Sequence, residues 1–224
     1  MITEFQNNGY IHLKNVIPNT TTDVIGEIVM SLKNKSLDGI KANAQKEYGS
    51  FGYWKGMDMA SKSDSRLYEF YTSKIMYDIA SELLETNDVY LFNDQVVVKL
   101  PNEDFEFPLH TDNELGPNPE LAKAGDFKTI TCCWPLDDFT NDNAPIDILN
   151  TGTNEWNTPL PTVGDIVIWN GNTYHKSGIN KTDKPRRVYL MVYANKDITS
   201  LSKEELKHNF INRYYNIKFP RSGV

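Results

Sequence analysis

Apolar residues recur every three or four positions in two stretches of the first third of the chain. The first stretch follows Asn19 and the three threonines after it, residue types that often begin helices. Its apolar positions are Val24, Ile25, Ile28, Val29 and Leu32. The second stretch follows Ser63-Asp64 and continues for about five turns. Its apolar positions are Leu67, Phe70, Tyr71, Ile75, Ile79, Leu83 and Leu84. The spacing predicts two amphipathic helices.

From about residue 88 the pattern changes to short runs rich in β-branched and aromatic residues. The runs are Val89–Leu100, Phe127–Leu136, Ile146–Leu149, Asp165–Trp169 and Val188–Tyr193. Turn residues separate them, and no helical pattern comes between them. They therefore favour an antiparallel sandwich or barrel over a parallel α/β sheet. A last amphipathic segment, from Leu201 to about Phe210, predicts a closing helix.

Length and composition bound the domain organisation. The chain has 224 residues, of which 39% are hydrophobic and 24% charged, so it can bury a core. No repeat or linker suggests a boundary. We expect a single domain over residues 1–224, with a helical part to about residue 87, a β core over about 88–195 and a C-terminal helix and tail over about 196–224.

Charge and hydropathy exclude several classes of partner. The net charge of −7 argues against nonspecific binding of nucleic acid, which depends on Lys and Arg. No apolar run approaches the roughly 20 residues that cross a bilayer, and the first ten residues lack the regions of a secretory signal. Cys132 and Cys133 are adjacent, so on a strand they point to opposite faces rather than closing a disulfide framework. A cytoplasmic protein that binds neither nucleic acid nor membrane is expected, and its oligomeric state is open.

Two histidines and an aspartate form the first candidate for chemistry. In an extended segment, His110 and Asp112 would project to the same side, although a surface pair on a loop would show the same spacing. His175 follows the apolar strand that ends at Trp169, where a hydrogen-bonded core histidine is the ordinary alternative. Taken together, two imidazoles and one carboxylate match the facial triad that holds iron in non-haem Fe(II) oxygenases.

Arg186 and Arg187 open the last predicted strand. Strand alternation places Arg186 on the aliphatic face with Val188, Leu190 and Val192, and Arg187 on the other face. An arginine that heads an aliphatic face would enter the barrel interior, where its charge needs a carboxylate. If no internal acid meets it, a dicarboxylic ligand is the natural counterion. The alternative is that both arginines lie at a solvated strand end.

These residues resemble a known family, the phytanoyl-CoA dioxygenase family of Fe(II)/2-oxoglutarate oxygenases. The resemblance begins at Phe5–Ile11 and is densest in the segment HKSGINKTDKPR, residues 175–186. There it matches a distal His, a Ser two residues later, an Asn-Lys-Thr segment and an Arg eleven residues past the His. The segments DQVVVK (94–99) and PLHTD (108–112) resemble the strand and motif that supply the other metal ligands. The segment CCWPL (132–136) resembles a strand whose Trp lines the cosubstrate pocket.

The resemblance implies a mainly β fold: a double-stranded β-helix (a cupin-like jelly-roll) with N-terminal helices packed on it. It implies that His110, Asp112 and His175 ligate Fe(II). Arg186 and Ser177 would bind the distal carboxylate of 2-oxoglutarate, with Gln95 and Trp134 nearby. Halogenating relatives lack the carboxylate ligand, so Asp112 favours hydroxylation. The chain departs from the family pattern at residues 143–145 and 150–154, a region that borders substrate in relatives, so the substrate cannot be carried over.

The expected function is a dioxygenase that uses Fe(II), 2-oxoglutarate and O₂ to hydroxylate an unactivated C–H bond of a small molecule, releasing succinate and CO₂. This chemistry needs no side-chain acid or base, so we nominate no catalytic residue beyond the metal ligands. A 2-oxoglutarate-dependent hydroxylase of protein or peptide side chains would use the same residues. A jelly-roll module that retains metal without turnover is an alternative from another class. A zinc hydrolase would use the triad but would not explain the spacing to Ser177 and Arg186.

Overall fold

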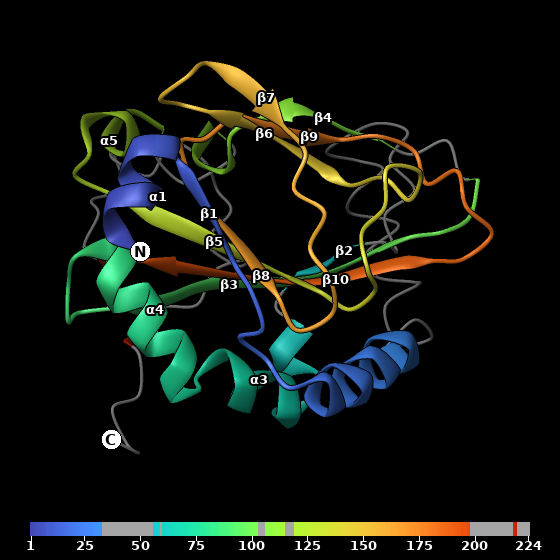
Figure 1. Ribbon diagram of the computed structural model, residues 1–224. Helices are drawn as coiled ribbons and strands as arrows, with labels where there is room; N and C mark the ends of the chain where they lie inside the picture. The colour runs from blue at the N-terminus through green and yellow to red at the C-terminus, as the bar shows by residue number, and fades with distance from the viewer. Residues whose placement is uncertain (33–55, 59, 103–105, 115–118, 198–216, 219–224) are drawn as a thin grey trace.

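The computed structural model describes residues 1–32, 56–58, 60–102, 106–114, 119–197 and 217–218. Two antiparallel sheets face each other in these residues, and helices cover the outer side of the larger one (Figure 1). The predicted closing helix (Leu201 to about Phe210) lies outside the described residues. None of the described helices is long and apolar enough to cross a membrane.

The larger sheet, called the major sheet, contains the central strands of the fold. Its hydrogen-bonded order is β1 (Tyr10–Leu13), β8 (Ile166–Asn170), β5 (Thr129–Pro135), β10 (Arg186–Ala194), β3 (Tyr90–Lys99) and β11 (Ile217–Lys218), and β2 (Gly56–Asp58) also pairs with β3. Because β1 comes from the predicted helical part, that part and the β core share one sheet.

The minor sheet has the order β4 (Phe107–His110), β9 (His175–Ser177), β6 (Ile146–Asn150) and β7 (Glu155–Asn157). The two sheets together confirm the expected mainly β jelly-roll with flanking helices. All five predicted strand runs are strands, with ends shifted by at most two residues. The short strands β4, β7 and β9 were not predicted, since three or four residues are too few to show an alternating pattern.

The helices are α1 (Ile2–Asn8), a helix described over residues 19–32, η2 (Ala60–Lys62), α3 (Ser65–Tyr71), α4 (Lys74–Leu84), η3 (Asp112–Glu114) and α5 (Pro119–Ala124). The single helix expected after Ser63-Asp64 is in fact two, α3 and α4. The chain leaves the helix at Ser73, which is extended with φ −70° and ψ 153°. The hydroxyl of Thr72 donates to the carbonyl of Tyr68 at 2.8 Å, a local bond that competes with helix continuation.

Strand alternation divides the core into two parts. On the outer face of the major sheet, Cys132, Trp134 and Tyr189 pack with apolar residues of the covering helices. On the inner face, Cys133, Trp169 and Val188 pack with Val97 and with residues of the minor sheet. The inner part is the smaller of the two, and it leaves a cavity between the sheets.

Candidate active site

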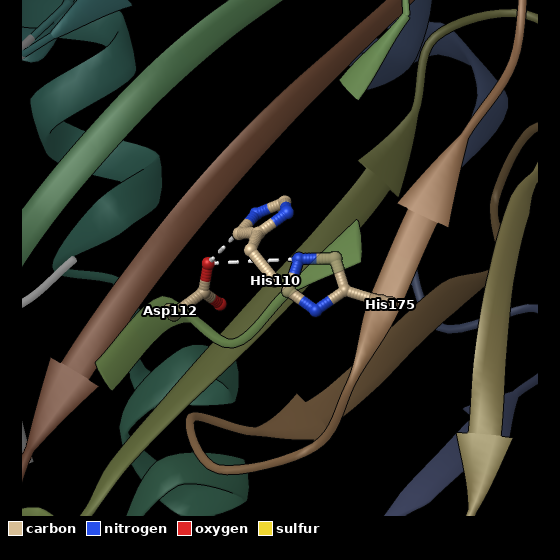
Figure 2. Close-up of side chains that lie close together, drawn as sticks. All are labelled: His110, Asp112 and His175. Carbon is tan, nitrogen blue, oxygen red and sulfur yellow. Dashed lines mark ion pairs between the residues drawn. The ribbon is translucent and has the colours of Figure 1, made fainter. Parts of the chain in front are cut away.

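The two histidines of the candidate site are brought together by strand pairing. His110 ends β4 and His175 begins β9, and the two residues are direct partners in the antiparallel register. Their ring centroids are 4.3 Å apart (Figure 2). Directly opposed residues of antiparallel strands project to the same face, so this pairing alone directs both imidazoles into the space between the sheets.

Asp112 reaches the histidines from a turn and not from the extended segment that we expected. The strand ends at His110, and Asp112 is the first residue of η3. Thr111 caps this short helix: its hydroxyl accepts from the backbone N–H of Glu114 at 3.1 Å. The Glu114 carboxylate in turn accepts from the backbone N–H of Thr111 at 3.2 Å. This reciprocal pair is a capping box, and the sequence Thr-x-x-Glu carries its signal.

The three side chains present one metal-binding atom each to a common point. Asp112 Oδ1 lies 3.6 Å from His175 Nε2 and 3.9 Å from His110 Nε2 (Figure 2). One ligand atom from each of the three residues lies within 4.8 Å of the others. Within the described part of the chain, this is the one group of three such residues that could hold a metal ion.

Backbone carbonyls fix the imidazole tautomers. His110 Nδ1 lies 2.6 Å from the carbonyl of Pro108, and His175 Nδ1 lies 3.0 Å from the carbonyl of Thr173. A carbonyl only accepts, so each Nδ1 carries the proton and each Nε2 keeps a lone pair for a metal. This is the usual arrangement of metal-ligating histidines.

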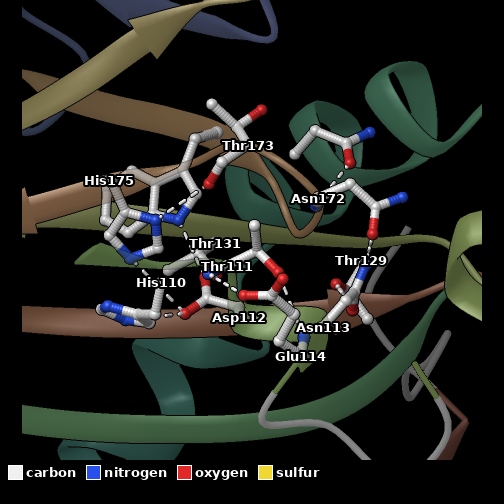
Figure 3. Close-up of polar contacts among 12 residues, drawn as sticks. His110, Thr111, Asp112, Asn113, Glu114, Thr129, Thr131, Asn172, Thr173 and His175 are labelled. Atoms are coloured by element: carbon white, nitrogen blue, oxygen red, sulfur yellow. Dashed lines mark hydrogen bonds and ion pairs between the residues drawn. The ribbon is translucent and has the colours of Figure 1, made fainter. Parts of the chain in front are cut away.

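Two donors hold the other oxygen of Asp112. Thr131 Oγ1 donates to Oδ2 at 2.6 Å, and Trp169 Nε1 donates to the same atom at 2.8 Å. Figure 3 shows Thr131 beside this carboxylate. With Oδ2 occupied, Oδ1 is left to face the histidines. Sequence reasoning missed both donors, because their role depends on how the strands pair and not on their spacing from Asp112.

The local charges suit metal binding. Burial by itself raises the pKa of Asp112, but the adjacent His175 and His110 and the two hydrogen bonds bring it below its usual value. Burial lowers the pKa of His175, which outweighs the opposite effect of Asp112. The site at neutral pH therefore holds an ionised carboxylate and a neutral His175, the protonation states in which these groups ligate metals.

Asn113 joins η3 to the turn between β8 and β9. Its amide donates to Asn172 Oδ1 at 2.9 Å and accepts from Thr129 Oγ1 at 2.8 Å (Figure 3). Its backbone N–H donates to the carbonyl of Gly171 at 2.9 Å. A Cβ on Gly171 would lie 2.0 Å from Thr129 Oγ1, so this approach requires glycine. These contacts fix Asp112 relative to His175.

The three residues border a cavity of about 470 Å³ between the sheets. At one end lies Arg186, which is 2% exposed and whose Nη2 donates to the carbonyl of Ala144 at 2.9 Å. Among the residues that the structure describes, its buried Nε has no hydrogen-bond partner and no carboxylate forms an ion pair with the guanidinium. Burial lowers the pKa of Arg186 to about 10, so the group is cationic at neutral pH. An unpaired cation therefore borders the cavity.

Two further residues proposed to contact the cosubstrate also line this cavity. Ser177 lies on β9 and is buried, and Gln95 lies on β3 and is half-buried. The Nζ of Lys99 donates to the carbonyls of Ser177 and Gly178, which ties the end of β9 to β3. The structure thus brings Ser177 and Gln95 to the same cavity as Arg186 and the triad.

The expected role of Trp134 at the cosubstrate pocket is not supported by its position. Trp134 is fully buried on the outer face of the major sheet, where its Nε1 donates to Thr22 Oγ1 at 3.2 Å and its ring packs on Phe70. The reason is strand alternation in β5: Thr129, Thr131 and Cys133 point inward, and Trp134 points outward. Trp134 is a core residue.

The alternation of the two arginines is as expected. Val188, Leu190 and Val192 line the cavity with Arg186. Arg187 points to the other face and pairs with Asp137, with Nη2 2.6 Å from Oδ1.

Asn180, part of an Asn-x-Thr sequence, is 1% exposed and donates to the carbonyls of Lys99 and Lys184. That amide shapes the loop before Arg186 and is inaccessible to glycosylation in the folded chain.

A sequence profile of the phytanoyl-CoA dioxygenase (PhyH) family matches residues 5–188, which is most of the chain. The chain belongs to this family. The resemblance seen in the sequence is thereby confirmed, and with it the enzyme class, an Fe(II)/2-oxoglutarate-dependent dioxygenase.

Solved structures share the fold at low sequence identity. SnoK, a non-heme alpha ketoglutarate dependent carbocyclase from nogalamycin biosynthesis, is 15% identical with a TM-score of 0.72, and the match covers 90% of this chain and 89% of that one. EctD from S. alaskensis, solved with 2-oxoglutarate and 5-hydroxyectoine, is 16% identical with a TM-score of 0.71, covering 86% and 74%. EvdO2 from Micromonospora carbonacea var. aurantiaca, solved with 2-oxoglutarate, is 15% identical with a TM-score of 0.64, covering 87% and 89%. These matches show that this chain shares the jelly-roll fold of the solved structures.

Proposed function

We propose that this protein hydroxylates an unactivated C–H bond of a small molecule, with His110, Asp112 and His175 as the iron ligands and Arg186 as the anchor of 2-oxoglutarate. One observation carries the proposal: a metal-competent triad and an unpaired buried guanidinium border the same cavity. Among the described residues, no carboxylate pairs with the Arg186 guanidinium, which donates to the carbonyl of Ala144 and lies over the ring of Phe139.

The donor set fits Fe(II). Two neutral imidazole nitrogens and one carboxylate oxygen on one side of an ion leave its other positions open, as non-haem Fe(II) oxygenases require. When bound, iron with 2-oxoglutarate and O₂ supplies the oxidising power for the C–H bond, and succinate and CO₂ are the other products. The protein orients the ligands through Thr131, Trp169 and the carbonyls of Pro108 and Thr173.

The opposite end of the cavity fits a dicarboxylate. Arg186 offers Nε, which lacks a hydrogen-bond partner among the described residues, and Ser177 offers a hydroxyl from β9 in the facing minor sheet. A carboxylate there would satisfy the guanidinium and neutralise its charge, which explains why an unpaired arginine is tolerated inside the protein. We assign Gln95, on the same cavity wall, to contact with the cosubstrate.

A small-molecule substrate agrees with the size of the cavity. Its volume of about 470 Å³ falls within the usual range of small-molecule sites, and most of its lining is apolar with a few polar groups. Relatives of this fold were solved with compounds such as nogalamycin RO and 5-hydroxyectoine. The presence of Asp112 favours hydroxylation over halogenation.

The first test is anaerobic spectroscopy of the purified chain. Addition of Fe(II) and 2-oxoglutarate should produce a visible charge-transfer band, and His110→Ala should abolish it. Arg186→Ala should weaken 2-oxoglutarate binding far more than the matched variant Arg187→Ala, because Arg187 pairs with Asp137 on the other face. A fully metallated protein without the band would exclude the oxygenase and leave the hydrolase alternative.

The second test measures turnover. A set of small metabolites is screened for stimulation of succinate release, and products are checked by mass spectrometry for the gain of one oxygen atom. Peptides as the sole stimulating compounds would favour the side-chain hydroxylase instead. A band without succinate release from any compound would indicate a binding module that keeps the metal but does not turn over.

A further inference from the structure

Asn93 is a buried polar residue in the cavity with no role in the site described so far. It lies on β3, is 6% exposed and lines the cavity. Its side-chain oxygen Oδ1 is buried and has no hydrogen-bond partner in the part of the chain that the structure describes. A buried amide oxygen without a partner is costly, and protein interiors rarely tolerate one without a reason.

The backbone at Asn93 is hydrogen-bonded although the pairing of β3 with β10 shifts register at Phe92, where the N–H donates to the hydroxyl of Tyr71. The carbonyl of Asn93 accepts from the hydroxyl of Tyr71 at 2.9 Å on the outer side of the sheet. The next residue, Asp94, points to that outer side and accepts from Ser61 and Tyr189. Alternation along β3 then directs the Asn93 amide inward, to the cavity.

The position of Asn93 separates it from the end where Arg186 lies. Across the major sheet, Asn93 is opposite Val192, and Val192 is opposite Thr131, whose hydroxyl holds Asp112. Arg186 lies six residues from Val192 along β10, about 20 Å at the usual rise of a strand. Asn93 is thus level with the metal end of the cavity but two strands, about 10 Å, to the side of Thr131, so a five-carbon acid that runs from Arg186 to the metal would end beside Thr131 and not at Asn93. The amide is therefore placed for a different molecule.

We infer that Asn93 recognises the substrate, and that the substrate presents a hydroxyl or N–H group to the Asn93 amide oxygen. Phe92 and Val192, which flank this end of the cavity, would contact its carbon skeleton. The inference rests on the proposed function, because it assigns the triad and the Arg186 end to metal and cosubstrate. It adds the chemical class of the substrate: a small molecule that carries a hydrogen-bond donor next to apolar carbon.

The first arm of the test compares stability and needs no substrate. Asn93→Leu replaces an unpartnered amide with an apolar group of similar shape, so the Tm of the metal-free chain should equal or exceed that of the wild type. Asn113→Leu is the matched control, since Asn113 is as deeply buried on the same cavity but is hydrogen-bonded to Asn172 and Thr129. That control should lose at least about 4 °C. A comparable loss in Asn93→Leu would make Asn93 a structural residue and overturn the inference.

The second arm uses paired probes with the Fe(II)- and 2-oxoglutarate-loaded protein. Small alcohols, diols and primary amines are each compared with analogues that are O-methylated at every hydroxyl or N,N,N-trimethylated, which keep the carbon skeleton and lose every O–H and N–H donor. In the wild type, donor compounds should stimulate succinate release at least tenfold more than their methylated partners. In Asn93→Leu, the ratio should approach one.

Three results of the second arm would overturn the inference. Equal stimulation by both members of each pair in the wild type, or by neither, would show that no donor is recognised. A preference that survives in Asn93→Leu would place recognition elsewhere. Loss of the 2-oxoglutarate charge-transfer band in Asn93→Leu would assign Asn93 to the cosubstrate instead. A band that persists in both proteins keeps the proposed function intact even if the substrate inference fails.

Discussion

The hydroxyl of Thr131 is expected to contribute measurably to metal affinity although it does not ligate the metal. It donates to Asp112 Oδ2 at 2.6 Å, a short bond typical of a hydroxyl to a carboxylate. Thr131→Val keeps the shape of the side chain and removes this donor. Asp112 would then be held by Trp169 alone and would sample orientations in which Oδ1 no longer faces the histidines.

The size of the effect follows from the bond that is lost. A hydrogen bond to a charged group contributes about 1.5–3 kcal/mol. Because Trp169 Nε1 still holds the same oxygen at 2.8 Å, we take the lower part of that range, about 1.5–2 kcal/mol. At 1.4 kcal/mol for each factor of ten, Fe(II) should bind roughly 10–30-fold more weakly. This agrees with the general effect of residues that orient metal ligands.

The assay is anaerobic competition for Fe(II) against a chromophoric chelator near neutral pH. The matched control is Thr129→Val, which makes the same change on the same face of β5, two residues away. Thr129 donates to Asn113 and not to Asp112, so this variant should change the affinity much less. Equal losses in the two variants, or wild-type affinity in Thr131→Val, would refute the view that the donor orients the ligand.

Three further predictions concern the cation, a buried carboxylate and the tight turn. Arg186→Met should abolish the 2-oxoglutarate charge-transfer band. The urea midpoint of the metal-free chain should stay equal or rise, because a buried charge without a carboxylate partner is removed. A large fall in that midpoint would show that the guanidinium is structural. Burial by itself raises the pKa of Asp165, but backbone N–H donors and His12 bring it below its usual value. The ionised carboxylate therefore stabilises the fold at pH values above the pKa of the unfolded chain, and this stabilisation is lost as the pH falls through the lower pKa of the folded chain. Asp165→Asn should therefore flatten the acid side of the stability profile measured by urea unfolding, and an unchanged profile would contradict this. Gly171→Ala should lower the free energy of unfolding, measured by chemical denaturation, by about 1–3 kcal/mol, because the added Cβ would collide with Thr129. The variant should also bind Fe(II) more weakly. Unchanged stability and affinity would show that the turn adapts.

The sequence was most informative where a pattern maps directly onto geometry. Alternation along one strand predicted that Arg186 enters the interior and that Arg187 does not, and the structure agrees. The same reasoning applied to β5 would have placed Trp134 outside, opposite Cys133. For Trp134, the family resemblance suggested a place at the cosubstrate pocket, whereas the alternation of side chains along β5 directs it to the outer face.

Other features could not be read from the sequence because they depend on contacts between distant segments. Trp169 donates to a carboxylate 57 residues earlier, and no local pattern records that pairing. Ser73 interrupts an apolar stripe whose helical spacing continues on both sides, so periodicity alone did not reveal the break between α3 and α4. The Asn93 amide is notable only once the cavity is seen, since an Asn on a strand is otherwise unremarkable.

The position of β4 gives metal binding a role beyond chemistry. β4 is an edge strand of the minor sheet, and in the described residues it pairs with β9 alone. Under the proposed function, its last residue and the residue that opens η3 would both supply metal ligands, and the third ligand would come from β9. An ion held there would cross-link these three segments, in the manner of a disulfide, at one edge of the minor sheet. Loading of the metal would then slow opening of this edge, so the same event that equips the enzyme for oxidation would also close the wall of its cavity.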